Sequence, residues 1–285
     1  MIKRIAVAGA GTMGSGIAMA AAQTGYMVSL FDTNETVLAK AKSAIKKNLD
    51  ILVEKQKIAA EESTVIFDRI LFSSSIEDCK ADLVIEAIVE IIEVKISLFN
   101  KLAAINHAGT IFASNTSSLS ITELQKDILH PERVAGMHFF NPAQIMKLVE
   151  VVKGEQTADH VTDSLMQVCL QMNKTAVLCK DAPGFIVNRV ARHYYLEAMK
   201  LVEQGIASFE SVDEVMEASG FKMGPFRLMD LIGMDINLAV SQSLYDAFNQ
   251  EQRFKPSDLQ KEKVSKNELG KKTGKGFYTY SSEKK

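Results

Sequence analysis

Three closely spaced glycines near the start of the chain constrain its fold more than any other feature. Residues 2–8 form a short, mostly apolar run typical of a β-strand, and the sequence Gly9-Ala10-Gly11-Thr12-Met13-Gly14 follows it directly. Residues 15–24, rich in alanine and methionine, favour a helix, and residues 26–31 favour a second strand that Asp32 closes. The order of strand, glycine turn, helix and strand predicts a βαβ unit.

The spacing of these glycines suits a dinucleotide. The first glycines let the backbone turn tightly and approach a pyrophosphate, whose charge is held by the amides at the helix N-terminus, and the third lets helix and strand pack closely. Asp32 follows Gly14 by 18 residues and can accept hydrogen bonds from a ribose diol, whereas it would repel a 2′-phosphate. We therefore expect NAD rather than NADP, held by Gly9, Gly11, Thr12, Met13, Gly14 and Asp32.

The rest of the first 182 residues alternates between strand and helix patterns. Further apolar, β-prone runs occupy residues 66–72, 83–85, 110–113, 134–137, 148–152 and 175–178, and helical patterns occupy residues 37–61, 90–104 and 159–172. This alternation predicts an α/β fold with a doubly wound, mostly parallel sheet of the Rossmann type. The helix over 37–61 is rich in lysine, which fits a solvated face and also a polyanionic ligand such as a coenzyme A nucleotide.

The pattern changes at the sequence Lys180-Asp181-Ala182-Pro183-Gly184. Beyond it the strand signals stop, and residues 185–204, 208–218 and 230–249 have helical patterns. We therefore expect an NAD-binding, Rossmann-type domain over residues 1–182 and a smaller, all-helical domain over residues 183–285.

Hydrogen-bonding side chains gather between residues 113 and 151. Asn115-Thr116-Ser117-Ser118 follows one expected strand, and His138 follows another. Such positions lie along the carboxyl edge of an open α/β sheet, where ligands bind. Glu150 stands inside an apolar run, where a carboxylate needs a partner, and a histidine beside a buried carboxylate can act as a general acid–base. On the residues alone, His138 fits either this role or that of a hydrogen-bonded structural histidine.

Composition argues against several classes of protein. The chain of 285 residues has a net charge of −2, so no overall basic surface favours nucleic acid or an anionic membrane. The three cysteines, Cys79, Cys169 and Cys179, cannot all pair and show no metal-ligand spacing, which is typical of a reducing cytosol. The apolar run after Lys3-Arg4 is too short for a signal peptide, and no run is long enough to cross a membrane. We expect a cytoplasmic protein without a metal site.

Together, the motifs resemble those of one enzyme family over nearly the whole chain. They are GAGTMGSGIA at the start, EAIVE at residues 86–90, ASNTSSLSIT at residues 113–122, GMHFFNPAQIMKLVEV, DAPGFIVNR and GKKTGKGFY. The chain resembles the short-chain L-3-hydroxyacyl-CoA dehydrogenases, most closely the bacterial 3-hydroxybutyryl-CoA dehydrogenases. The MHFFNP motif followed by APGFIVNR is far more specific than a glycine fingerprint.

The resemblance implies a role for each matching residue. It makes His138 and Glu150 the catalytic pair. It implies that Ser117 lies near the C3 oxygen of the substrate, and that Asn188 helps to hold the acyl group. The residues implied on the nicotinamide side of NAD are Glu90, Lys95, Asn115, Ser117, Asn141 and Lys272, and those implied on coenzyme A are Asn48, Lys55 and Ser117. At Asn48 some relatives have serine, so this chain departs from them there.

The reaction implied by the resemblance is the reversible, NAD-dependent oxidation of a (S)-3-hydroxyacyl-CoA thioester to the 3-oxoacyl-CoA. 3-Hydroxybutyryl-CoA and acetoacetyl-CoA are the expected pair. The resemblance also implies a homodimer through the helical domain, residues 183–285, which would serve both substrate binding and dimerisation.

Two departures from the butanoate enzymes leave the acyl group open. Residues 190–198 are more aromatic, and the loop at residues 218–225 is shorter. One alternative is a 3-hydroxyadipyl-CoA dehydrogenase of aromatic-acid catabolism, whose terminal carboxylate needs a cationic partner such as Arg192 or Lys222. A second alternative is a dinucleotide-binding protein without turnover, since fold alone does not fix function.

Overall fold

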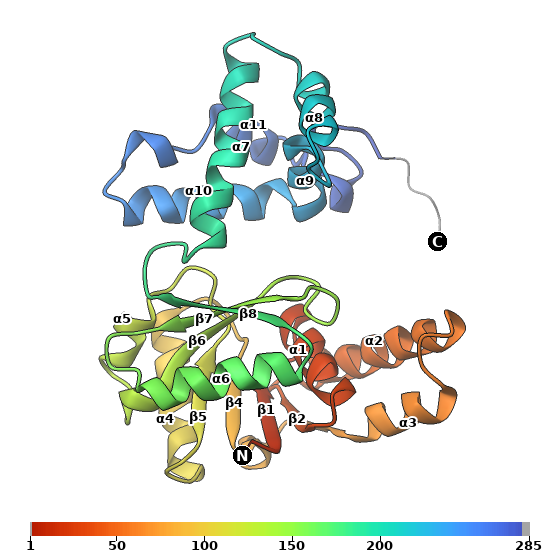
Figure 1. The fold of residues 1–285 in the computed structure, drawn as a ribbon, viewed down its shortest axis with the longest axis vertical. Helices are drawn as coiled ribbons and strands as arrows, with labels where there is room; N and C mark the ends of the chain where they lie inside the picture. Colours follow the sequence, from red (N-terminus) through yellow and green to blue (C-terminus); the bar gives the residue numbers. More distant parts are fainter. Residues whose placement is uncertain (1, 281–285) are drawn as a thin grey trace. The chain divides into compact units, whose positions relative to one another are not determined.

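The computed structural model describes residues 2–280, and the chain divides into two compact units, Met1–Ala182 and Pro183–Lys285. The first unit contains an eight-stranded sheet in the order β3-β2-β1-β4-β5-β6-β7-β8 (Figure 1). Its strands are β1 (Arg4–Ala8), β2 (Met27–Phe31), β3 (Ile70–Ser73), β4 (Leu83–Glu86), β5 (Ile111–Ser114), β6 (Val134–Phe139), β7 (Leu148–Lys153) and β8 (Thr175–Lys180).

The strand order places a ligand-binding edge at the centre of the sheet. β1 pairs in parallel with β2 on one side and with β4 on the other, so the direction of winding reverses there. The carboxyl ends of β1, β4, β5 and β6 share one edge, and open α/β sheets bind ligands at such a reversal. β7 runs antiparallel to β6 and therefore starts at this same edge. The predicted doubly wound, mostly parallel sheet is confirmed.

Helices pack against this sheet (Figure 1). They are α1 (Thr12–Gln23), α2 (Glu35–Glu54), α3 (Ala60–Asp68), α4 (Ile92–Ile105), α5 (Ile121–Gln125) and α6 (Asp159–Gln171). The alanine-rich face of α1 is buried against β1 and β2, because small side chains let a helix approach a sheet closely. α6 packs on β7 and β8.

Two predicted boundaries in this unit are wrong. The single helix expected over residues 37–61 is two helices, because Gln56 adopts a left-handed φ of 53° between α2 and α3. The strand expected from residue 66 starts only at Ile70, since Ile66 still belongs to α3 and is buried there as a helical residue.

The second unit is helical, as predicted. It contains α7 (Val187–Glu203), α8 (Phe209–Ala218), α9 (Pro225–Ile232), α10 (Met234–Ala247) and α11 (Asp258–Ser265). One continuous helix was expected over residues 230–249, but α9 and α10 are separated by Gly233, whose φ of 106° no helix can contain. The core of this unit brings together Tyr195, Met199, Phe226, Met229 and Met234.

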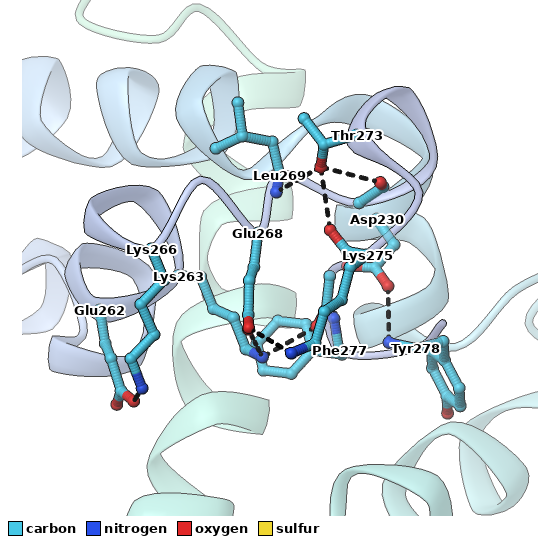
Figure 2. Close-up of polar contacts among 12 residues, drawn as sticks. Asp230, Glu262, Lys263, Lys266, Glu268, Leu269, Thr273, Lys275, Phe277 and Tyr278 are labelled. Carbon is cyan, nitrogen blue, oxygen red and sulfur yellow. Dashed lines mark hydrogen bonds and ion pairs between the residues drawn. The ribbon is translucent and has the colours of Figure 1, made fainter. Parts of the chain in front are cut away.

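The C-terminal segment, residues 270–280, is tied into the second unit by a buried carboxylate (Figure 2). The sequence alone predicted only a turn with solvated charges. Asp230 of α9 accepts hydrogen bonds from the backbone N–H groups of Phe277 at 3.0 Å and Tyr278 at 2.9 Å, and from the hydroxyl of Tyr280 at 2.9 Å. A Cβ atom at Gly276 would lie 2.1 Å from Asp230 Oδ1, so only glycine fits at that point of the segment.

Ion pairs hold the flank of the same segment. Glu268 lies 2.7 Å from Lys263 Nζ and 2.6 Å from Lys275 Nζ (Figure 2). Hydrogen bonds from Lys263 and Lys275 lower the pKa of Glu268 to about 2. Thr273 closes the turn, because its hydroxyl donates to the carbonyl of Lys275 at 3.0 Å.

Residues 2–280 contain neither a membrane-spanning helix nor a cluster of metal-ligating side chains. None of the helices there has both the length and the apolar composition needed to cross a membrane. That part of the chain also brings no three His, Cys, Asp or Glu side chains together in a group that could hold a metal ion.

We predict that Asp230→Asn destabilises the second unit by about 2 kcal/mol, because an amide nitrogen cannot accept the hydrogen bonds that the carboxylate receives in the interior. Asp246→Asn is the matched control, since Asp246 is exposed on α10. Urea unfolding, followed by the near-ultraviolet circular dichroism of tyrosine, measures the stability of both variants. Equal midpoints for the two variants would show that Asp230 does not hold the C-terminal segment.

Candidate active site

A buried histidine and a buried carboxylate face each other across β6 and β7. His138 and Glu150 are direct partners in the antiparallel register of these strands. Nδ1 of His138 lies 2.8 Å from Oε2 of Glu150, and the two residues are only 6% and 1% exposed. β6 extends through Phe139, so His138 lies inside the strand, one residue short of its end, and not just after it. The contact inferred from the sequence is present.

This geometry suits proton transfer. A carboxylate beside Nδ1 selects the tautomer with a proton on that nitrogen and stabilises the imidazolium ion when the ring gains a second proton. The ring of Phe140 lies 4.5 Å from the His138 ring, centroid to centroid, and restricts how the imidazole can turn. With Nδ1 facing the carboxylate and the ring packed on Phe140, the imidazole is held in one orientation, as general acid–base chemistry requires.

The glycine turn after β1 has the shape that a pyrophosphate needs. A Cβ atom at Gly9 would lie 2.5 Å from the carbonyl oxygen of Ala87, and one at Gly14 would lie 1.7 Å from the carbonyl oxygen of Gly9, so packing requires both glycines. At Gly11, by contrast, a Cβ atom would meet nothing within 4 Å. Gly11 caps α1, whose first turn carries no acidic residue and receives no side-chain cap. The residues present therefore fit a dinucleotide phosphate.

Asp32 connects the end of β2 to this turn. Its Oδ2 accepts a hydrogen bond from the N–H of Ala10 at 2.9 Å, and its Oδ1 accepts one from the N–H of Asn34 at 2.9 Å. Each oxygen keeps a further lone pair, so the half-buried carboxylate can still accept hydrogen bonds from a ribose diol.

A second buried ionic group lies at the carboxyl end of β4. Lys95 is 1% exposed, and its Nζ lies 2.5 Å from Oε1 of Glu86 and 3.1 Å from Oε2 of Glu90. Glu86, which is fully buried, also accepts hydrogen bonds from Ser114 Oγ at 2.7 Å and from the N–H of Ile88 at 2.7 Å. Lys95 and Glu90 were predicted from the sequence as site residues, whereas Glu86 was not. The sequence does contain a signal for Glu86, because this carboxylate ends an apolar run, just as Glu150 stands inside one.

Glu90 carries this network to the polar loop after β5. Its Oε1 accepts hydrogen bonds from Thr116 Oγ1 at 2.5 Å and from the N–H of Ser117 at 3.0 Å. Burial raises the pKa of Glu90, but the charge of Lys95 and these hydrogen bonds outweigh it, so the pKa lies below its ordinary value of 4.5. The loop that carries Ser117 is thus held by a charged side chain.

Asn115 joins the same loop to the histidine strand. Its Oδ1 accepts a hydrogen bond from the N–H of Phe139 at 2.9 Å, next to His138. Asn141, just beyond, is exposed and lines a pocket of about 340 Å³ together with Gly11 and Thr12. The pocket brings the glycine turn and the segment after β6 together.

The far wall of this pocket is the part of α2 from Val37 to Asn48. Lys40 and Asn48 line it there. Lys55 is exposed at the C-terminal cap of α2, about two helical turns beyond Asn48 on the same face. A long ligand that leaves the pocket along this face would therefore pass both residues.

The remaining predicted residues belong to the second unit. Asn188 lies in the first turn of α7. Lys272 lies in the C-terminal segment, where its Nζ is 2.5 Å from Oδ1 of Asp235 at the start of α10.

The chain matches two family models that together cover nearly all of it. Residues 4–182 match the 3-hydroxyacyl-CoA dehydrogenase NAD-binding domain, and residues 184–280 match the 3-hydroxyacyl-CoA dehydrogenase C-terminal domain. The chain is 46% identical over 285 residues to the 3-hydroxyadipyl-CoA dehydrogenase of Escherichia coli. This match covers 99% of this chain but only 60% of that protein. It is 43% identical to the mitochondrial hydroxyacyl-coenzyme A dehydrogenase of Sus scrofa, over 98% of this chain and 92% of that one.

A solved structure shows the same fold. The crystal structure of 3-hydroxybutyryl-CoA dehydrogenase from Escherichia coli superposes with a TM-score of 0.96 at 45% identity. The match covers 100% of this chain and 61% of that one, so the chain spans about three fifths of the length of both Escherichia coli relatives.

We predict that the Glu90→Gln variant loses less stability than the unmodified protein as the pH falls from 7 to 3. A carboxyl group whose pKa is lowered by folding contributes stability above its unfolded pKa, and that contribution disappears as the pH falls through the folded pKa. For Glu90 the loss falls below pH 4.5. Thermal midpoints between pH 3 and 7 measure the effect, with Glu93→Gln, an exposed neighbour, as the control. If the thermal midpoint of Glu90→Gln fell with pH as steeply as that of the unmodified protein, Glu90 would not contribute this stability.

Proposed function

Because the chain belongs to the 3-hydroxyacyl-CoA dehydrogenase family, whose members are NAD-dependent oxidoreductases, we propose that His138 and Glu150 catalyse the reversible oxidation of a (S)-3-hydroxyacyl-CoA. The proposed substrate is 3-hydroxybutyryl-CoA and the product acetoacetyl-CoA. The observation that supports this most strongly is the buried contact of 2.8 Å between His138 Nδ1 and Glu150 Oε2 at the carboxyl edge of the sheet.

In this proposal the proton of the substrate's 3-hydroxyl passes to Nε2 of His138. Glu150 keeps its hydrogen bond to Nδ1 and balances the charge that the ring gains, in an environment where both residues are shielded from water. When bound, NAD⁺ supplies the acceptor for the hydride of C3. In the reducing direction His138 starts protonated and returns the proton to the oxygen. Ser117 and Asn188 donate hydrogen bonds to substrate oxygens.

The cofactor residues proposed from the sequence differ in their roles. The glycine turn receives the pyrophosphate, and Asp32 receives the adenosine ribose and favours NAD over NADP. Glu90, Asn115, Ser117 and Asn141 face the nicotinamide side. Lys95 is buried between two carboxylates, so we assign it the task of holding Glu90 in place. Lys272 is the proposed contact from the second unit.

The coenzyme A portion of the substrate is proposed to run along α2. The pocket of about 340 Å³ lies between the glycine turn and this helix, and Asn48 lines it. The exposed ammonium of Lys55, further along the same face, can pair with a phosphate of coenzyme A.

A carboxylated acyl chain is the second candidate, since the Escherichia coli relative is named a 3-hydroxyadipyl-CoA dehydrogenase. Of the two cations considered for its terminal carboxylate, Arg192 is 3% exposed, and its Nη1 already donates to Asn237 and Ser241 inside the second unit. Lys222 is exposed next to Phe221 and is the better partner for an incoming carboxylate.

We also propose that the protein is a cytoplasmic homodimer. Leu231, Ile232 and Ile236 are exposed around the α9–α10 junction and form an apolar surface that a second copy could cover. Cys79, Cys169 and Cys179 are free thiols, which suits a reducing compartment. Light scattering of the protein and of an Ile236→Glu variant tests the dimer.

Loss of NADH absorbance with acetoacetyl-CoA tests the proposed reaction. We predict rapid turnover with NADH, much slower turnover with NADPH because of Asp32, and a fall in kcat of about 10²–10⁴-fold in His138→Ala. Binding of NADH, measured by its fluorescence, should be nearly unchanged in that variant. Near-normal turnover of His138→Ala would remove the histidine from the mechanism.

The same assay run forward with NAD⁺ separates the two acyl candidates. A higher kcat/KM for 3-hydroxyadipyl-CoA than for 3-hydroxybutyryl-CoA, lost in Lys222→Met, would favour the carboxylated substrate. NADH binding without turnover of any of these thioesters would favour the non-catalytic alternative.

A further inference from the structure

The turn between β6 and β7, residues 140–147, forms one wall of the pocket. Asn141, Pro142 and Gln144 line the pocket from this turn. Ile145 and Met146, at its tip, are exposed, so burial of the tip does not hold the turn in place. The turn joins β6, which carries His138, to β7, which carries Glu150. The position of the turn therefore matters for binding.

A buried ammonium group holds the turn from one side. Lys174, between α6 and β8, is 7% exposed, and its Nζ donates hydrogen bonds to the carbonyl oxygens of Ala143 at 2.6 Å and Met146 at 2.8 Å. The turn also closes on itself, because the N–H groups of Ile145 and Met146 both reach the carbonyl of Pro142 at 2.9 Å. Lys174 thus binds one carbonyl oxygen before the tip and one at the tip.

The cost of burying this charge suggests that the contact is needed. Within residues 2–280, the group that acts electrostatically on Lys174 is the thiol of Cys169, not a carboxylate. Burial lowers the pKa of Lys174, since an ammonium ion loses its hydration there. An apolar side chain of similar length would avoid this cost, but it could not bind the two carbonyl groups.

Helix α1 limits the turn from the other side. A Cβ atom at Gly16 would lie 2.8 Å from Oε1 of Gln144 and 3.2 Å from Cβ of Ala143. Glycine at this position lets α1 lie directly against the turn. The turn is therefore confined between Gly16 and the ammonium of Lys174.

We propose that Lys174 is a positioning residue for ligand binding: it holds the 140–147 turn against α1 so that Asn141 and Gln144 complete the pocket. Lys174 acts only through the carbonyl groups of the turn and does not touch the ligand. The predicted effect on binding rests on the proposed function, whereas the effect on the turn does not.

Kinetics of Lys174→Met test the effect on binding. We expect KM for acetoacetyl-CoA or NADH to rise by about 10-fold or more, which corresponds to loss of one hydrogen bond to a charged group, while kcat changes much less. Lys174→Arg should restore most of the binding, because a guanidinium can also donate to two carbonyls. Lys153→Met is the matched control, since Lys153 pairs with Asp159 at the far end of β7. A loss confined to kcat, or equal in the control, would overturn the proposal.

Limited proteolysis tests the position of the turn without any substrate. Lys147 is exposed directly after Met146, so trypsin should cut after Lys147 faster in Lys174→Met than in Lys153→Met. Gly16→Ala pushes the turn from the α1 side and should give the same cleavage and the same rise in KM, even if Lys174→Met folds poorly. Unchanged cleavage in both variants would contradict the proposal. Faster cleavage in a protein that turns over no thioester would contradict only the proposed function.

Discussion

The geometry of the candidate active site depends on the register between β6 and β7. Because these strands are antiparallel, His138 and Glu150 lie directly opposite each other, and Nδ1 and Oε2 come within 2.8 Å. A slip of one residue would turn Glu150 to the other face of the sheet, where a buried carboxylate would lose its partner. The apolar neighbours Met137, Val149 and Val151 are fully buried and specify the register, so packing of the core also sets the distance between His138 and Glu150.

The same arrangement of a buried carboxylate and its partner occurs twice at this edge of the sheet. In each case a carboxylate placed in an apolar strand binds a group that would otherwise be mobile: Glu150 binds the imidazole of His138, and Glu86 binds the ammonium of Lys95. Lys95 in turn fixes Glu90, and Glu90 fixes the loop that carries Ser117. Ionic groups in the interior are costly, but fully paired ones hold their partners rigidly, as a precisely positioned site requires.

Local sequence patterns predicted those parts of the fold that depend on residues close together in the chain. The glycine spacing, Asp32 and the alternation of strands and helices predicted the βαβ unit and the sheet. The breaks at Gln56 and Gly233 were missed, because a helical pattern continues through both positions and only the backbone angles reveal the interruption. The contacts of Lys174 with Ala143 and Met146 were also out of reach, since they join residues 28 or more positions apart and one partner in each is a backbone carbonyl. The roles of the site residues stay predictions.

The measurement that tests the central claim most directly is a double-mutant cycle between His138 and Glu150. The kcat for reduction of acetoacetyl-CoA is compared in His138→Ala, Glu150→Gln and the double variant. If Glu150 acts through the histidine, the double variant will be about as slow as His138→Ala alone, because Glu150 has nothing left to orient. If the two losses multiply instead, Glu150 contributes independently of His138, and the account of a coupled pair is wrong.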